Sequence, residues 1–336
     1  MEQKYNNGKK IEEITKALAL LEENQEWVER YKNYISNALV KEKGKHPFNK
    51  PKGLSLYSSV SMYKGNTYDL RYDGQSVGKI CWSKDSLILE PQTKANEKYF
   101  DLEGLPEAMP WLSPEAEKFR KFFKDKAAAS SDIRLKSPEH RVENRLLKEF
   151  SINKGNEKSL CYIQPIKLNR YFFQFPTPLK ASDHKKGLSY AKQYGGGIDI
   201  FARVITKNNK KRICVMEVKD QNIESESQST TMEQALPYAV FVARLLRSES
   251  GQQWWDFFRN NNKDSKPIPP HLDIDVVTIM PQGNTEEFSD KFINVPELDT
   301  TLHCHSLYYN DEDFKNGKFT FSGTYPNQLK KYKRKA

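Results

Sequence analysis

The sequence predicts an α/β protein in which a mixed central sheet lies between helices, preceded by an N-terminal helix and a small antiparallel β domain. Three observations predict this arrangement. After residue 131, runs with helical apolar spacing alternate with short β-forming runs. The run Ile213 to Met216 is apolar at every position, which is typical of a strand covered on both faces. Short strands in residues 54–91 flank Asp73-Gly74, a hairpin signal.

Composition narrows the class of protein. The chain has 336 residues, is 37% hydrophobic and carries a formal charge of +10, so it can build a core and favours a polyanionic partner. No apolar run approaches the ~20 residues of a membrane span, and the N-terminus lacks the apolar core of a signal peptide. The four cysteines form no CxxC pair, which indicates free thiols and a cytoplasmic location.

The N-terminal part of the chain divides into three segments. Residues 1–53 are expected to form an amphipathic helix, Ile11 to Val40, followed by a basic linker, Lys41 to Gly53. The helix packs on its own domain or on a partner, including a second copy of the chain. Residues 54–92 read as a β meander, and residues 93–130 as a connector with one helix after Ser113-Pro114.

The second domain is expected over residues 131–310, followed by a C-terminal hairpin and basic tail over 311–336. Its helices are predicted at "PEHRVENRLLKEF" and "TTMEQALPYAVFVARLLRSES", and its strands at "SLCYIQPIKL", "YFFQFP", "HLDIDVVTIMP" and "TTLHCHSLYY". A hairpin, "GGGIDIFARVITKNNKKRICVMEVKD", lies between the early strands and the second helix. The tail, Leu329 to Ala336, is either a phosphate contact or a solvated end.

Three charges interrupt this apolar hairpin. Glu217 and Lys219 share one face of a strand because successive side chains alternate. If the hairpin loop has an odd number of residues and is centred on Asn209, Asp199 falls opposite Lys219 and beside Glu217. A slip of one residue would send Asp199 to the other face, so the sequence predicts either an odd-numbered loop or a bulge that re-aims Asp199.

Two carboxylates this close need a cation. Mg²⁺ suits the site because it binds one or two carboxylates together with waters and phosphate oxygens, and Mn²⁺ is expected to substitute for it. The carbonyl oxygen of Val218 could be a further ligand, and Lys219 could position the attacking water. The alternative is a salt bridge among Asp199, Glu217 and Lys219 without a metal.

The pattern "GGGIDIFARV…VMEVKD" resembles the core of the PD-(D/E)XK nuclease superfamily in its RecB-like form, over about residues 131–309. Downstream, Gln234-x-x-x-Tyr238 resembles the Q-x-x-x-Y motif of that branch, whose side chains bind substrate. An acidic residue on the preceding helix matches Glu143, with Glu139 as competitor. One departure is that Ile198 rather than proline precedes Asp199.

The resemblance implies a restriction-endonuclease-like α/β/α sandwich with a mixed central sheet and a Mg²⁺-dependent nuclease that hydrolyses DNA. By this resemblance, Asp199, Glu217 and Glu143 of this chain would hold the metal. A catalytically inactive nucleic-acid-binding or assembly module is the alternative, and an enzyme for another phosphorylated substrate is a third.

Other residues admit two interpretations. His303 and His305 share a strand face and are either a metal pair or two solvent-facing side chains. The aromatic run from Trp254 to Phe258 stacks on bases or packs in the core. Thr230-x-x-Glu233 predicts a capping box, and Pro237 a kink or a later helix start.

Overall fold

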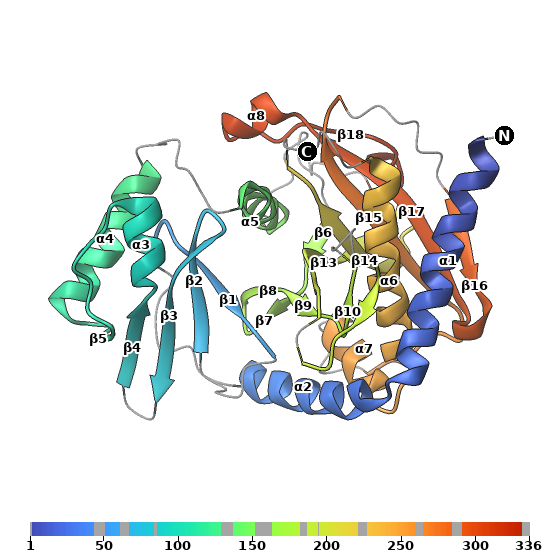
Figure 1. Ribbon diagram of the computed structural model, residues 1–336, viewed down its shortest axis with the longest axis horizontal. Helices are drawn as coiled ribbons and strands as arrows, with labels where there is room; N and C mark the ends of the chain where they lie inside the picture. The colour runs from blue at the N-terminus through green and yellow to red at the C-terminus, as the bar shows by residue number, and fades with distance from the viewer. Residues whose placement is uncertain are drawn as a thin grey trace. The chain divides into compact units, whose positions relative to one another are not determined.

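A computed structural model of the protein describes residues 2–43, 51–60, 67–83, 86–128, 137–151, 163–181, 187–193, 195–220, 227–259, 265–283 and 291–330 (Figure 1). The described chain is a mixed α/β protein that divides into two compact units. Unit 1 comprises residues 1–35, 147–166 and 174–336, and unit 2 comprises residues 36–146 and 167–173. Both units are discontinuous in sequence, whereas the segments expected from the sequence were consecutive.

Unit 1 is built on a mixed sheet with the strand order β16-β17-β15-β14-β13-β6. The three central strands, β14, β15 and β17, are parallel to one another, while β13, β6 and β16 pair antiparallel. The strands are β6 (Ile163–Pro165), β13 (Ile200–Ile205), β14 (Lys211–Val218), β15 (Leu272–Pro281), β16 (Lys291–Val295) and β17 (Thr300–Tyr309). The short β18 (Phe321–Ser322) also pairs with β17. The strands predicted at "HLDIDVVTIMP" and "TTLHCHSLYY" are therefore confirmed.

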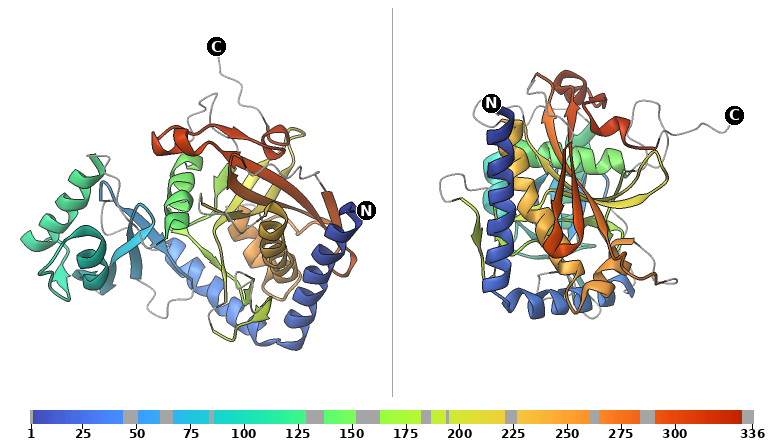
Figure 2. Two further views of the ribbon diagram at one scale, coloured as in Figure 1. Left: turned by 45° about the horizontal axis from the view of Figure 1, so that its top comes forward. Right: turned by 90° about the vertical axis from the view of Figure 1, so that its right-hand side faces the viewer.

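Helix α6 (Gln228–Leu246) covers one face of this sheet and is itself covered by α1 (Glu2–Glu23), which runs alongside it in both Figure 1 and Figure 2. Because α6 has protein on two sides, it is buried along almost its whole length. The ring of Trp27 packs 5.6 Å from that of Phe241, and Arg244 pairs with Glu22 at 2.8 Å. Ile14, Ala17 and Leu21 of α1 are buried within unit 1, whereas Ile11 is 55% exposed.

Aromatic side chains fill the space between the sheet and α7 (Gly251–Arg259). Phe175 stacks on Phe201 at 5.0 Å, and Phe201 meets Phe258 edge to face at 4.8 Å. Trp254 and Phe258 are fully buried. The aromatic run from Trp254 to Phe258 is therefore core.

The predicted single N-terminal helix is instead two helices. α1 ends at Glu23 and α2 (Glu26–Lys43) begins three residues later, with a break at Asn24 and Gln25. The indole N–H of Trp27 donates to the carbonyl oxygen of Leu21 at 3.0 Å, which ties the start of α2 back to the last turn of α1. The drift of the apolar stripe along residues 11–40 reflects this change of axis.

Unit 2 contains a second sheet, with the strand order β5-β4-β3-β2-β1-β8-β7. The strands are β1 (Ser55–Ser58), β2 (Thr67–Tyr72), β3 (Gln75–Ser83), β4 (Ser86–Pro91), β5 (Met109–Pro110), β7 (Lys167–Leu168) and β8 (Tyr171–Phe173). The predicted meander and its Asp73-Gly74 turn are confirmed: Tyr72 pairs with Gln75, and both turn residues have positive φ. The sheet is larger than predicted because β8 adds a parallel pair to β1.

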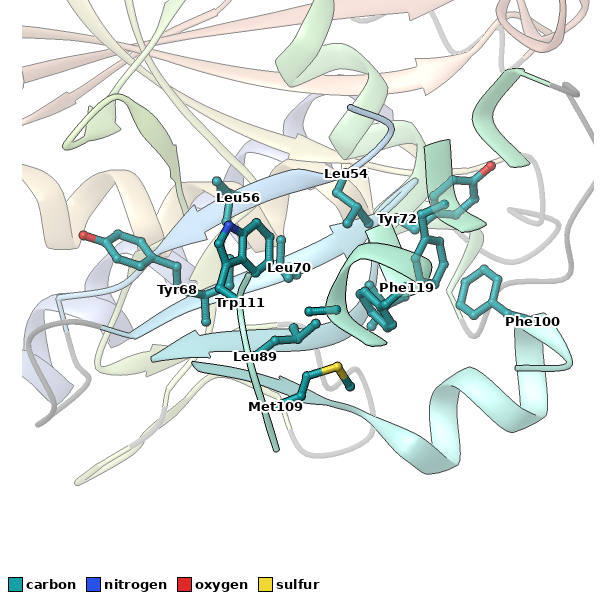
Figure 3. Close-up of a cluster of buried hydrophobic side chains, with 14 of the residues drawn as sticks. Leu54, Leu56, Tyr68, Leu70, Tyr72, Leu89, Phe100, Met109, Trp111 and Phe119 are labelled. Carbon is teal, nitrogen blue, oxygen red and sulfur yellow. The ribbon is translucent and has the colours of Figure 1, made fainter. Parts of the chain in front are cut away.

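The core of unit 2 lies between its sheet and two helices, α3 (Thr93–Phe100) and α4 (Pro114–Ala128) (Figure 3). Phe123 is fully buried among the rings of Tyr72, Phe100 and Phe119, at 4.9–5.2 Å. As predicted, α4 follows Ser113, whose Oγ accepts a hydrogen bond from the Ala116 N–H at 3.2 Å. Unit 2 therefore has its own hydrophobic core.

Two predicted strands are each divided between the units. "SLCYIQPIKL" contributes β6 to unit 1 and β7 to unit 2, and "YFFQFP" contributes β8 to unit 2 and β9 (Phe175–Pro176) to unit 1. A tight turn at Asn169 and Arg170, both with positive φ, joins β7 to β8. The predicted helix at Pro138 is confirmed as α5 (Pro138–Phe150).

The two basic runs lie largely outside the described residues, which omit 44–50 and 331–336. The predicted C-terminal hairpin contains a helix, α8 (Asp311–Lys315), between β17 and β18. None of the helices in the described ranges is both long enough and apolar enough to cross a membrane.

Candidate active site

Asp199 occupies the point where the chain changes partners. The residues before it form β12 (Gly197–Ile198), which pairs with β9, and the residues after it form β13, which pairs with β14. Asp199 itself is a bend between the two strands and is half-buried. Its Oδ2 accepts a hydrogen bond from the Val218 N–H at 2.9 Å, so its carboxylate lies at the end of β14.

The β13–β14 hairpin has the odd-numbered loop that the sequence predicted. Ile205 pairs with Lys211, and the Thr206 N–H donates to the Lys210 carbonyl at 2.9 Å. Three residues close the turn, and the last of them, Asn209, has φ +59°. The sequence predicted a loop centred on Asn209, which is wrong by one residue. Asn209 is instead the last residue of the turn, so the turn is centred on Asn208. Continuing the register therefore places Asp199 level with Glu217, rather than opposite Lys219.

Glu217 and Lys219 form a buried ion pair. They are 4% and 7% exposed, and Lys219 Nζ lies 3.3 Å from Glu217 Oε1. The backbone of Lys219 is fixed on both sides, because its N–H donates to Ile279 and its carbonyl accepts from the Tyr309 hydroxyl at 3.1 Å. The two charges are held at the carboxyl end of a parallel strand, where α/β folds commonly bind ligands.

The hydroxyl of Tyr238 lies within electrostatic range of all three charged residues. Burial raises its pKa most, and the negative charges of Glu217 and Asp199 raise it further, while Lys219 lowers it. The same oxygen accepts a hydrogen bond from the Ala181 N–H at 3.3 Å. Both carboxylates and the ammonium are therefore within electrostatic reach of one phenol.

The absence of a side chain at Gly196 leaves room for the Tyr238 hydroxyl. A Cβ at position 196 would lie 2.2 Å from the Tyr238 hydroxyl oxygen, and one at 195 would lie 2.0 Å from the Thr177 carbonyl oxygen. The Gly196 backbone is itself bonded to the neighbouring strand, donating to Leu179 at 2.7 Å. The glycine run thus lets the backbone approach α6 and β9 closely.

Gln234 lies one helical turn before Tyr238 on α6 and is 3% exposed, so the two residues share a face as predicted. The predicted capping box is wrong: the N-cap is Ser227, whose Oγ accepts from the Thr230 N–H at 3.2 Å. Glu233 pairs instead with Lys9 at 2.8 Å. The helix runs from Gln228 to Leu246 with Pro237 inside it.

Three polar residues near the site were missed from the sequence. Thr278 is the β15 neighbour of Glu217 and is fully buried, and it accepts a hydrogen bond from Gln228 Nε2 at 3.3 Å. The Tyr308 hydroxyl donates to Gln228 Oε1 at 2.6 Å. Thr278 interrupts an apolar strand just as Glu217 does, and that interruption was the available signal.

Glu143 lies in the part of α5 that belongs to unit 2, where it is 1% exposed. Its neighbours there include Tyr57, whose pKa is raised first by burial and then by the charge of Glu143. Its competitor, Glu139, is half-buried on the same helix. Asp199 and Glu217 belong to unit 1, so a metal shared with Glu143 stays a prediction.

The donors of unit 1 suit a hard cation. Two carboxylates and the Val218 carbonyl are oxygen ligands, which favour Mg²⁺ over zinc. In the part of the chain that the structure describes, no three His, Cys, Asp or Glu residues cluster as a metal site. Mg²⁺ commonly binds through one or two carboxylates with waters, so Asp199 and Glu217 fit it.

The sequence favoured two solvent-facing histidines at positions 303 and 305, and this prediction is wrong. His303 and His305 are 7% and 3% exposed. His303 Nε2 lies 2.5 Å from Asp273 Oδ1, and the ring of His305 packs 5.2 Å from that of Tyr325. Strand β17 is covered more fully than its sequence suggested, because the C-terminal segment returns over it.

Comparisons with known proteins give no relative for this chain. No family model matches it, and neither a curated protein nor a solved structure matches it.

Proposed function

We propose that the protein is a Mg²⁺-dependent nuclease that hydrolyses phosphodiester bonds of DNA, with unit 1 as a restriction-endonuclease-like domain. The observation that carries the proposal is the grouping of Asp199, Glu217 and Lys219 at the end of β14, where Asp199 accepts from the Val218 N–H and Glu217 pairs with Lys219. A cytoplasmic location belongs to the same proposal.

Asp199 and Glu217 would hold the cation, with the Val218 carbonyl as a further ligand. The cation, when bound, supplies positive charge that offsets the phosphate charge and lowers the pKa of a bound water. Mn²⁺ is expected to replace Mg²⁺ because it takes similar oxygen ligands.

The protein side chains would orient the reactants. Lys219 is fixed through its backbone to β15 and β17, so its ammonium can hold an attacking water or the developing charge in one position. Gln234 and Tyr238 present an amide and a hydroxyl from one face of α6, and these groups can donate hydrogen bonds to the DNA phosphates.

The test is a cleavage assay on supercoiled plasmid and on a single-stranded oligonucleotide, with Mg²⁺, with Mn²⁺ and with EDTA. We expect metal-dependent cleavage that falls at least a hundredfold in Glu217→Gln and in Asp199→Asn. The matched control is Glu233→Gln, because Glu233 pairs with Lys9 away from the site and its loss should leave cleavage unchanged. Equal cleavage by wild type and Glu217→Gln would contradict the assignment.

A second candidate is a nucleic-acid-binding or assembly module without catalysis. It is favoured by one observation: Glu217 is paired with Lys219 and Asp199 accepts from Val218, so these charges have partners without a metal. This candidate predicts DNA binding in EDTA that Glu217→Gln does not change, with no cleavage in any metal. Turnover of a small phosphodiester without DNA affinity would instead indicate an enzyme for another phosphorylated substrate.

A further inference from the structure

Unit 1 contains a basic pocket that the proposed active site does not use. Its volume is about 440 Å³, within the range of small-molecule sites. It lies between the β13–β14 hairpin, helix α7 and the segment that follows α7. The side chains that define it are Arg203, Lys211, Arg212, Trp255, Arg259 and Lys266.

The charge of this pocket is one-sided. Of its lining residues within the described ranges, five are cationic and none is acidic. The charge of Arg212 is balanced by Asp275, a carboxylate outside the pocket lining, because Arg212 Nη1 lies 3.0 Å from Asp275 Oδ1. Among the residues that the structure describes, no carboxylate pairs with Arg203, Lys211, Arg259 or Lys266.

Arg203 is a half-buried cation of this pocket. Burial lowers its pKa, and no acidic group in the described ranges acts against that burial. Its Nε is buried and has no hydrogen-bond partner in the described ranges. Removing a guanidinium from water without a counter-charge costs free energy, and a bound anion would offset that cost.

The pocket walls hold a second guanidinium in place. Trp255 is 9% exposed, and the Arg259 guanidinium lies 5.4 Å from its ring centroid, within cation–π range. Pro267 and Pro269 also line the pocket, and their rings restrict the backbone there. Arginine is suited to phosphate because its planar fork can donate two parallel hydrogen bonds.

The pocket is separate from the candidate active site. Asp199 precedes β13 and Arg203 lies four residues further on, or about 13 Å along an extended strand. Lys211 and Arg212 begin β14, whereas Glu217 lies near its end. The C-terminal segment also pairs with the end of β13, where the Lys330 N–H donates to the carbonyl of Ile205 at 2.9 Å.

We infer that this pocket binds a phosphate-bearing ligand of nucleotide size. Its volume excludes a folded macromolecule but admits a nucleotide, and its charge favours several phosphate oxygens over a single carboxylate. Such a group is carried by a free nucleotide or by the phosphorylated end of a nucleic-acid strand. The inference does not depend on nuclease activity.

The experiment is calorimetric titration of the full chain, in buffer without phosphate or metal. The probes are pyrophosphate, ATP and one short oligonucleotide with either a 5′-phosphate or a 5′-hydroxyl. Binding of pyrophosphate and ATP alone identifies a free nucleotide, and tighter binding of the 5′-phosphorylated oligonucleotide identifies a strand end. No heat with any probe at millimolar concentration overturns the inference.

Variants locate the binding. Arg259→Gln and Arg203→Gln are each expected to raise Kd at least tenfold, whereas Lys318→Gln, an exposed lysine outside the pocket, should leave it unchanged. Substitution of Arg259 is expected to disturb folding less than substitution of Arg203, because Arg259 lies at the end of α7. The Arg259→Gln protein should therefore unfold at the same temperature as wild type. Glu217→Gln should bind the probes normally, which separates this pocket from the active site. Equal weakening in all variants contradicts the assignment.

Discussion

At the scale of single residues, the contact between Gly196 and Tyr238 sets the geometry of the candidate site. The hydroxyl of Tyr238 is 2.2 Å from where a Cβ of residue 196 would stand. Real Cβ contacts are much longer, so a side chain at 196 must displace the tyrosine or the backbone. The glycine is required here by space, and its φ is not positive.

Gly196→Ala is therefore expected to lower the free energy of unfolding by about 1–3 kcal/mol, the usual cost of overpacking. It should also reduce cleavage by moving the Tyr238 hydroxyl. The measurement is denaturant unfolding of Gly196→Ala in the wild-type and Tyr238→Ala backgrounds. The cost should shrink when Tyr238 is absent, because the two effects are coupled. Strictly additive effects would show that the clash is elsewhere.

His303 makes a prediction about pH. Burial lowers its pKa below the ordinary 6.5, although Asp273 at 2.5 Å acts in the opposite direction. Folded His303 is then neutral over a pH range in which the unfolded chain binds a proton. Its contribution to stability is complete above pH 6.5 and is lost as pH falls through the lowered pKa, by about 1.4 kcal/mol per unit of lowering.

The measurement is the free energy of unfolding of wild type and His303→Gln between about pH 7.5 and 5. The wild-type value should fall more steeply with acid than that of the variant. Asp273 is distinguishable because its pKa is lowered from 3.8, so its contribution is lost only in stronger acid. Parallel pH profiles for the two proteins would contradict this account.

At the scale of elements, helix α6 positions Gln234 and Tyr238, and its first turn fixes where that face begins. The Oγ of Ser227 accepts from the Thr230 N–H, so the helix begins one turn before the predicted cap at Thr230. This earlier start places Gln228 in the first turn, where it reaches Thr278 beside Glu217.

Ser227→Ala should lower the free energy of unfolding by about 1 kcal/mol, because it removes the acceptor for an end N–H of the helix. Ser227→Asp should keep most of the stability, since aspartate also caps. Chemical denaturation of both variants, with Thr230→Val as the comparison, measures the effect. A larger loss in Thr230→Val than in Ser227→Ala would support the cap predicted from the sequence instead.

Local patterns predicted the elements well, because their causes are local. The turn at Asp73-Gly74 and strand β17 (Thr300–Tyr309) followed from neighbouring residues. The parity of the β13–β14 hairpin also followed, since three charges had to share a face. The central residue of this turn could not be predicted, because it depends on the positive φ of +59° at Asn209. Nor could the break at residues 24 and 25, where no proline or glycine marks the end of α1.

At the scale of the whole molecule, two hydrophobic cores divide the chain. The core of unit 2 is centred on Phe123, and that of unit 1 includes Phe201. Sequence patterns could not assign residues 167–173 to unit 2, because pairing of β8 with β1 joins residues more than a hundred positions apart. The helix that carries Glu143 was predicted correctly. Its assignment to unit 2 could not be predicted, because it depends on contacts between residues far apart in the sequence.

Phe123→Ala should destabilise unit 2 by about 3–5 kcal/mol, as is usual when a buried phenylalanine is truncated. Amide hydrogen exchange, read peptide by peptide, should show faster exchange in residues 67–83 than in β15. The matched control is Phe201→Ala, which should show the reverse pattern. Uniform acceleration in both variants would mean that the two cores unfold together.

The discontinuity of both units has a consequence for how the chain is made. A ribosome delivers β1 and β2 long before β8, so the sheet of unit 2 stays incomplete until residues 167–173 have emerged. Likewise the apolar residues of α1 that α6 covers stay uncovered until α6, which ends at Leu246, has been made. The nascent chain therefore exposes apolar surface until both β8 and α6 have emerged.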